Sequence, residues 1–391
     1  MQKNLLLIVC LLSVFFLKAQ PFVLSQDAEI SVLTIGPGSS LNDAFGHNAF
    51  RIKDSSNNLD IVFDYGRYDF DAPNFYLNFA QGKLNYSIGD SRFYDFLKFY
   101  IWQNRTVKEQ VLNLTQTEKQ RLLSYLLNTI KPENKEYLYD FFYDNCATKI
   151  RDVLEIIKKN EIQFNEPQGF KQETFRTLIQ DNLNRNSWGS FGIDLALGSV
   201  IDKKATGYEF MFLPKFIFEF FGNATLLNSD KKLVKQTNIL NKKTKTPEDN
   251  LFITSPLAVF GIIGLMVLFI TFKDFKNQRR THWLDVSLFG LTGIIGILIL
   301  LLWFATDHKS THQNYNLLWA CALNLLVIYQ LFRKKVSAWF VRYLKFLVIL
   351  LCLMLLHWIL GVQVFAIGLI PFLVALIIRY LYLIHFFKKV Y

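Results

Sequence analysis

Cysteine and histidine are scarce in this chain, and most of the region after the N-terminal apolar run lacks both. The 391 residues include 4 cysteines and 6 histidines. Between residues 20 and 250 there is one of each, Cys146 and His47. A single cysteine excludes a disulfide within that region, and an unpaired thiol outside the cytosol suggests reactivity or intermolecular pairing. We expect neither a metal site nor a cofactor.

Each of these two residues also has an ordinary structural interpretation. A lone cysteine often serves as a small buried apolar side chain, and a lone histidine as a core residue with its hydrogen bonds satisfied. The sequence around His47 and Cys146 must therefore be used to distinguish a structural role for these residues from a catalytic one.

The net charge of +11 does not indicate nucleic-acid binding. The basic residues gather in the loops between apolar runs and in the segment 231–245, which carries six lysines. Such charge marks membrane topology and a linker rather than a basic binding face. No nucleic-acid partner is expected.

The first 19 residues have the pattern of a secretory signal peptide. Lys3 precedes the apolar run "LLLIVCLLSVFFL" at 5–17, and the small residue Ala19 follows it. The run is too short and too early for a spanning helix. A lipoprotein signal at Cys10 is disfavoured, because the bulky Val9 stands where a small residue is needed.

The C-terminal third changes character and predicts a membrane domain over 255–391. Five apolar runs approach spanning length, at about 255–272, 284–304, 316–332, 338–360 and 362–384. Basic residues gather in the loops 273–280 and 333–335 and in the tail, at Arg379, Lys388 and Lys389. The opposite loops, 305–315 and 361–362, contain a single lysine or arginine, Lys309. By the positive-inside rule, residues 20–250 lie outside the cytoplasm.

The exported region predicts an α+β domain over 20–226. Strand patterns occur at 30–35, 48–52, 60–66, 83–90 and 106–114, and helical spacing at 91–101, 117–130, from about 146, and 173–183. The aromatic segment 209–222 fits either a membrane-interface element or a core element. The polar, lysine-rich stretch 227–254 predicts a linker to the membrane domain.

Cys146 stands where a thiolate would be stabilised. "DNCATKIRDVLEII" predicts a helix that begins at about 146, with Asp144 or Asn145 as its N-cap. A helix N-terminus favours negative charge, and a nearby imidazole would complete the activation of the thiol. His47, on the strand that follows Gly46, is the candidate base. Asp64, on the next strand, would orient its ring, and the Cys146 backbone N–H is a candidate oxyanion donor.

Several spaced motifs together resemble a known family. They are "GPGSSLNDAFGHNAFRI", "FDYGRYDF", "YDNCATKIRD", "LALGSVID" and "EFMFLP". The histidine-before-cysteine order is similar to the circularly permuted papain-like proteins, including the lecithin:retinol acyltransferase-like enzymes. More closely, residues 28–225 resemble the N-terminal periplasmic domain of the Lnb family of lipoprotein N-acyltransferases. In that family we expect an amide residue where this chain has Asp64.

The resemblance implies a fold, a location and a reaction. The fold would be a permuted papain-like α+β domain followed by an all-α bundle of about five transmembrane helices. The protein would lie in the bacterial inner membrane with its catalytic domain in the periplasm. Cys146 would take a fatty acyl chain from a phospholipid donor as a thioester. The α-amine of a lipidated N-terminal cysteine on a lipoprotein acceptor would then receive the chain, with His47 as proton shuttle.

The same resemblance suggests residues for substrate binding. Beside the pair, Tyr65 and Asn145 are candidates. In the loop "TDHKSTHQNYN", His308, Asn314 and Asn316 could contact lipid head groups, although an ordinary polar loop explains them equally well. Arg51 and Arg151 could neutralise a phosphate, with structural ion pairs as the alternative.

Two other functions remain open from the sequence. One is a membrane-tethered papain-like peptidase or amidase that acts on cell-wall peptides. Five spans disfavour it, because a hydrolase would need a single anchor. The other is a non-enzymatic envelope scaffold or sensor.

Overall fold

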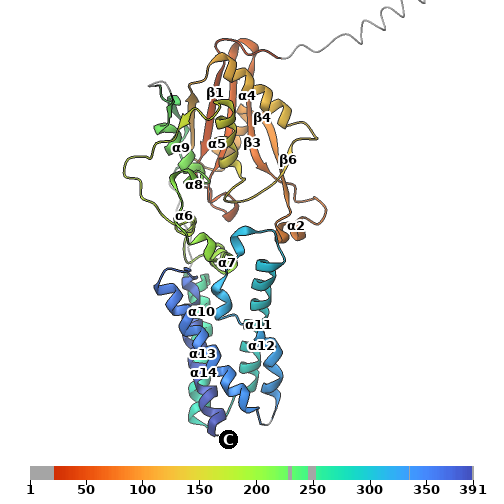
Figure 1. Cartoon of the computed structure of the whole chain (residues 1–391), viewed down its shortest axis with the longest axis vertical. Coiled ribbons are helices and arrows are strands. Elements are labelled where there is room, and N and C mark those ends of the chain that lie inside the picture. The colour runs from red at the N-terminus through yellow and green to blue at the C-terminus, as the bar shows by residue number, and fades with distance from the viewer. Residues whose placement is uncertain (1–21, 228–230, 245–251, 334, 390–391) are drawn as a thin grey trace, which may run out of the picture.

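A computed structural model describes residues 22–227, 231–244, 252–333 and 335–389. The expected signal peptide, 1–19, lies outside the described residues. The chain forms two parts stacked along its long axis, a sheet domain and a bundle of long helices (Figure 1). An α+β domain therefore precedes a helical domain.

The first part is built on an antiparallel seven-stranded sheet. The strand order is β6-β4-β3-β2-β1-β5-β9, and every neighbouring pair is antiparallel. The bounds are β1 Glu29–Ile35, β2 His47–Asp54, β3 Leu59–Arg67, β4 Asn85–Arg92, β5 Val107–Leu112, β6 Glu136–Leu138 and β9 Val234–Asn241. The alternation of side chains along these strands supplies apolar residues to both faces.

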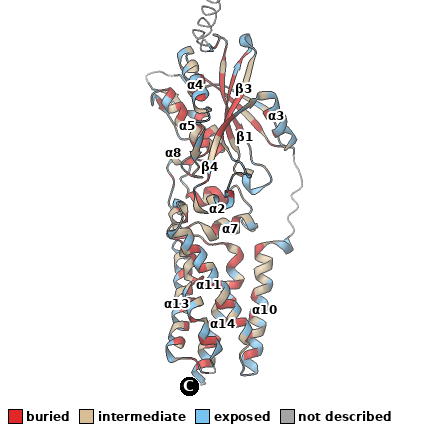
Figure 2. Ribbon diagram, turned by 90° about the vertical axis from the view of Figure 1, so that its right-hand side faces the viewer, coloured by how far each residue is buried: buried red, intermediate tan, exposed pale blue. Residues whose placement is uncertain are grey.

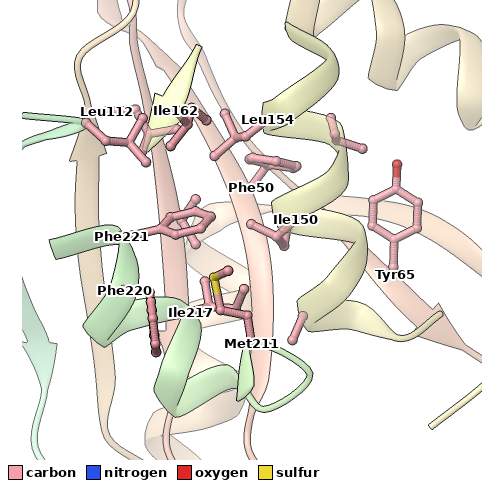
Figure 3. Packing of buried hydrophobic residues seen from close by; sticks show 14 of the residues in the cluster. Phe50, Tyr65, Leu112, Ile150, Leu154, Ile162, Met211, Ile217, Phe220 and Phe221 are labelled. Atoms are coloured by element: carbon pink, nitrogen blue, oxygen red, sulfur yellow. The ribbon is translucent and has the colours of Figure 1, made fainter. Parts of the chain in front are cut away.

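Helices cover both faces of the sheet. One face packs on α3 (Phe93–Trp102) through Leu33, Ala49 and Val62. The other carries the main core, which includes Phe50 and packs on α4 (Gln116–Thr129), α5 (Cys146–Ile157) and α9 (Pro214–Asn223). Figure 3 shows Ile150 and Leu154 of α5 facing Phe50. The smaller elements are α2 Phe75–Gln81, β7 Ile162–Gln163, α6 Phe175–Gln180, α7 Trp188–Ala196, α8 Gly207–Phe210 and β8 Thr225–Leu226.

One segment of this part answers a question that the sequence left open, and a second corrects an expectation. The aromatic stretch 209–222 lies in the core, where Phe212, Phe220 and Phe221 are almost fully buried. The expected linker 227–254 contains a strand, because β9 pairs with β5 from Val234 to Asn241. None of the β9 side chains is buried and half of them are exposed, which explains why its composition resembles that of a linker.

The second part contains four helices that are long and apolar enough to cross a membrane, or five if one bent pair counts as a span. They are α10 Pro256–Lys276, α11 His282–Phe304, α13 Ala338–Ile359 and a segment that includes α14, Ile370–Lys389. The expected span at 316–332 is bent and divided into η6 (Tyr315–Leu318), α12 (Leu323–Val327) and η7 (Ile328–Phe332).

The broken segment has a physical cause. Asn316 and Asn324 are fully buried, and their side chains bond to other parts of the fold. At Gly296 of α11 the backbone of 320–322 comes so close that an added β-carbon would lie 2.2 Å from the Ala320 oxygen. Close backbone contact through small residues is typical of membrane helices.

Arg379, which was counted among the basic residues of the C-terminal tail, lies within helix α14. This side chain is fully buried, and it forms ion pairs with Asp274 at 2.8 Å and Asp285 at 2.7 Å. It therefore joins α14 to α10 and α11. The remaining basic residues in the loops and the tail still predict the orientation of the membrane domain.

The two parts are joined by buried polar contacts, here called the docking contact. Asn314 donates to the Leu195 and Ala196 carbonyls, and Asn316 donates to those of Asp194 and Leu195. Both asparagines have 0 % exposure. Buried amides with their hydrogen bonds satisfied hold a fixed geometry, so α7 sits at a defined position above the membrane domain.

Candidate active site

His47 opens β2 at the end of the sheet that points toward the membrane domain. The residue before it, Gly46, has φ +85°, and a β-carbon there would lie 2.6 Å from the Ile35 carbonyl oxygen. Only glycine accommodates this turn without strain. His47 pairs with Ile35 of β1 and is thereby fixed beside the neighbouring strands.

Cys146 is the first residue of α5, and the N-cap is Asn145 rather than Asp144. The Asn145 side chain accepts hydrogen bonds from the backbone N–H groups of Ala147 and Thr148. It also donates to the carbonyls of Phe141 and Phe212. The Cys146 N–H is one of the helix N–H groups that have no partner within the helix, and it lies beside the thiol.

The helix N-terminus brings Cys146 to the ends of β2 and β3. A β-carbon added at Gly66 would lie 3.8 Å from the Cys146 Cβ. The His47 ring and the Asn48 backbone N–H lie close enough to the Cys146 sulfur to stabilise its thiolate. The structure therefore brings together the two residues that are about a hundred positions apart in the sequence.

The surroundings stabilise a charged pair. Burial alone would raise the pKa of the Cys146 thiol, but the His47 charge and the hydrogen bonds to His47 and Asn48 outweigh it, so the pKa lies below its usual value. Burial opposes protonation of His47 in the same way. The Tyr100 oxygen, the Cys146 thiolate and Asp64 outweigh it, and the pKa of His47 lies well above its usual value. A thiolate–imidazolium pair is the arrangement that both directions favour.

Asp64 contacts the histidine directly. Its Oδ2 atom lies 3.2 Å from His47 Nε2, and its Oδ1 atom accepts a hydrogen bond from Arg67 Nε at 2.9 Å. Burial would raise the pKa of Asp64, but His47 and Arg67 lower it below the usual value. The carboxylate is thus ionised and held in place by two cationic neighbours.

Two residues near the pair were not found from the sequence. Tyr100 of α3 has its ring centroid 6.4 Å from that of His47. Arg105 lies over the Tyr100 ring at 4.9 Å, is only 4 % exposed, and donates to the Gly36 carbonyl. Its Nη2 atom has no hydrogen-bond partner among the described residues. No local pattern marks these residues, because the sheet brings them to the site.

Aromatic side chains border the nucleophile on another side. The stretch "YLYDFFYDNC" places Tyr137 and Tyr139 shortly before Cys146. Burial and the Cys146 charge raise the pKa of Tyr139 well above its usual value, so its phenol stays protonated beside the thiolate. Tyr139 stacks on Tyr86 of β4, with ring centroids 4.1 Å apart. The density of tyrosine in this stretch was the available sequence signal.

Several of the expected substrate-binding residues are engaged elsewhere. Tyr65 belongs to the main core and lies beside α5 (Figure 3), and its ring packs on that of Tyr137. Arg51 forms ion pairs with Asp60 and Glu109 on the face covered by α3. Arg151 pairs with its neighbour Asp152 and lies over a tyrosine ring of α8. Asn145 uses its side chain as the helix cap.

The three candidates in the membrane domain also have structural partners, and Asn314 belongs to the docking contact. His308 Nε2 lies 2.9 Å from the Phe79 carbonyl oxygen of α2. Asn316 belongs to the docking contact and accepts a hydrogen bond from the Trp319 indole. Among the described residues, no cluster of three or more histidine, cysteine or acidic side chains could hold a metal ion.

Comparison with known families gives two matches. Residues 18–181 match the Lnb N-terminal periplasmic domain, and residues 247–390 match the Lnb transmembrane domain. No curated protein and no solved structure matches the chain. The matched ranges include the Cys146–His47 pair and every helix of membrane-spanning length.

Proposed function

Since the chain belongs to the Lnb family, as a multi-pass membrane protein with a periplasmic N-terminal domain, we propose that it is a lipoprotein N-acyltransferase. It moves a fatty acyl chain from a phospholipid to the N-terminal lipidated cysteine of a lipoprotein. The observation that carries this proposal is the Cys146–His47–Asp64 contact at the end of the sheet nearest the membrane domain.

In the first step the Cys146 thiolate attacks the ester carbonyl of the phospholipid. The resulting oxyanion lies near the N-terminus of α5, where the Cys146 N–H can donate a hydrogen bond to it. The C–O ester bond then breaks. His47 gives its proton to the departing alkoxide, which leaves a lysophospholipid and an acyl-thioester on Cys146.

In the second step the α-amine of the lipoprotein attacks the thioester carbonyl. His47, now neutral, accepts the proton that the amine loses, and the C–S bond breaks to return the thiolate. An amide bond has replaced the ester bond, with no oxidation or reduction. Because His47 Nε2 contacts Asp64, Nδ1 is the ring nitrogen available for these transfers.

The positions of the two domains support lipid substrates. Both proposed substrates keep acyl chains in the bilayer while their reacting groups stand at its surface. The docking contact fixes the sheet domain on the membrane domain, so the reacting groups are held near Cys146 rather than reached by free diffusion. A tethered cell-wall amidase would gain nothing from such a fixed position.

We also propose where the catalytic domain lies in the cell. The catalytic domain would lie on the periplasmic side of the inner membrane after removal of the signal peptide behind Ala19. Neither step uses a cofactor or a metal ion.

A strain that depends on this protein for lipoprotein acylation tests the function. Mass spectrometry of a reporter lipopeptide should show the N-acyl form with the wild-type protein and its loss with Cys146→Ser or His47→Ala. Full N-acylation with both variants would refute the proposal. Cleaved cell-wall peptides together with unchanged lipoproteins would favour the amidase.

A further inference from the structure

Helix α2 of the sheet domain is tied to the membrane domain. The Asp307 backbone N–H donates to the Gln81 carbonyl at 2.8 Å, and His308 Nε2 contacts the Phe79 carbonyl at 2.9 Å. Figure 2 shows α2 between the sheet and the long helices, whereas α3 lies beside the sheet, farther from the bundle. The position of α2 is therefore set by the loop that follows α11.

That loop fixes the depth of α2 relative to a bilayer. Helix α11 ends at Phe304, and Asp307 is three residues farther along, which is at most about 10 Å of chain. The polar layer on each side of the hydrocarbon core is roughly 5–8 Å thick. Trp303 and Phe304 stack at the end of α11, where aromatic residues gather at membrane surfaces. Helix α2 thus lies at the level of the lipid head groups.

The helix and the loop before it expose large apolar side chains. Tyr76 is 77 % exposed, Leu77 54 %, Phe79 55 % and Phe70 56 %. Four such residues within ten positions form a patch that water would not favour. At head-group depth, the same patch would bury its apolar surface in lipid.

Aromatic contacts lead from this segment toward the nucleophile. Phe70 and Tyr68 both pack on Phe75 of α2, with centroids 4.9 and 6.0 Å from it. Tyr68 packs on Tyr86 at 5.3 Å, and Tyr86 stacks on Tyr139. The charge of Cys146 acts directly on Tyr139. A line of ring contacts thus runs from Phe70 to Tyr139, toward the thiol.

We propose that residues 68–81 form a lipid-entry segment. Its exposed face, Phe70, Tyr76, Leu77 and Phe79, inserts into the outer leaflet and contacts lipid acyl chains. Its ring line guides the chain of the donor lipid to Cys146. The guiding role rests on the proposed function; the contact with the bilayer does not.

Photo-crosslinking in proteoliposomes of phosphatidylethanolamine and phosphatidylglycerol tests the contact. The full-length protein carries p-benzoylphenylalanine in place of Tyr76 or, as matched control, of Tyr94. Tyr94 lies on α3 and is 71 % exposed. Mass spectrometry should find lipid adducts at position 76 in roughly tenfold or greater excess over position 94. Equal yields, or adducts at 76 to a second protein copy instead of lipid, would overturn the contact.

Kinetics of Cys146 acylation test the guiding role. A Tyr76→Glu/Leu77→Glu variant should form the thioester from vesicle lipid at least about tenfold more slowly than the wild type. Its reaction with the soluble ester p-nitrophenyl butyrate should stay within about twofold, which shows that the site is folded. Tyr94→Glu should behave as the wild type in both assays.

The outcomes separate the two proposals. Unchanged acylation of the double variant by vesicle lipid would overturn the entry segment and leave the acyltransferase intact. If the wild type forms no thioester with any lipid, the acyltransferase and the guiding role fall together, while the crosslinks at position 76 still decide the membrane contact.

Discussion

The reactivity of Cys146 should depend on His47 before any substrate is present. Replacing His47 by alanine removes the positive charge and the hydrogen bond that hold the pKa of the thiol below its usual value. Above its pKa the thiol is a thiolate, so the wild type should react with iodoacetamide at pH values where an ordinary thiol is inert. In His47→Ala the midpoint of the pH–rate profile should move to higher pH.

The size of the effect follows from the thiolate fraction. An ordinary thiol with a pKa near 8.5 is about 0.3 % thiolate at pH 6, so the thiolate fraction falls by about 300-fold when a full thiolate becomes an ordinary thiol. A thiolate of higher pKa is also a stronger nucleophile, with a Brønsted coefficient of roughly 0.4–0.5. This offsets about half of the logarithmic loss. We therefore expect a rate at pH 6 that is roughly tenfold lower.

The assay is alkylation of the full-length protein in detergent across pH 5–9, with peptide mapping to separate Cys146 from Cys321 and Cys352. Alkylation needs no proton transfer, so it isolates the electrostatic role of His47 from its role as a shuttle. His385→Ala, a histidine at the far end of α14, is the matched control. Coincident pH profiles for the wild type and His47→Ala would refute the charged pair.

Three further variants test the supporting residues. Asp64→Asn should lower the pKa of His47, because the carboxylate helps to raise it. The alkaline limb of the pH–rate profile for acyl transfer should therefore move to lower pH, and turnover should fall roughly tenfold or more. An alkaline limb at the same pH as in the wild type would show that Asp64 does not support His47. Asn145→Ala deletes a helix cap and leaves two buried carbonyls without donors, so unfolding should cost about 2–4 kcal/mol less, visible as a melting temperature several degrees lower. Asn316→Ala loosens the docking contact, and it should slow acyl transfer from vesicle lipid while Cys146 alkylation stays unchanged; equal losses in both assays would point to general unfolding.

Local sequence patterns predicted the elements whose own apolar residues recur at strand or helix spacing. Strands β1 to β3 and helices α4 and α5 carry apolar residues at strand or helix spacing, and each lies within a few residues of its expected place. Strand β9 could not be predicted, because its partner β5 is more than a hundred residues away and none of its side chains is buried. The break in the segment 316–332 likewise depends on hydrogen bonds from Asn316 to another domain.

The candidate site also contains residues that the sequence indicates and residues that only the fold brings together. Cys146 and His47 could be selected because each is the single residue of its type in the exported region, and the structure brings them into contact. Asp64 could be selected because it lies on the neighbouring strand, where it forms the end pair of the β2–β3 register with Ala49, two residues from His47. Tyr100 and Arg105 reach the pair through tertiary packing alone. For Arg51 the sequence left two interpretations, because a buried arginine with acidic partners has the same sequence signature as one that binds a phosphate; in the structure it forms ion pairs with Asp60 and Glu109.

The most direct test of the account is the acyl-enzyme itself. Purified protein is mixed with phospholipid vesicles in the absence of a lipoprotein acceptor, and the intact mass is then measured. We predict a mass increase of one fatty acyl chain on Cys146 that hydroxylamine at neutral pH removes, and its absence in Cys146→Ser. An unmodified Cys146 after prolonged incubation, with the protein folded and its thiol still open to alkylation, would contradict the account.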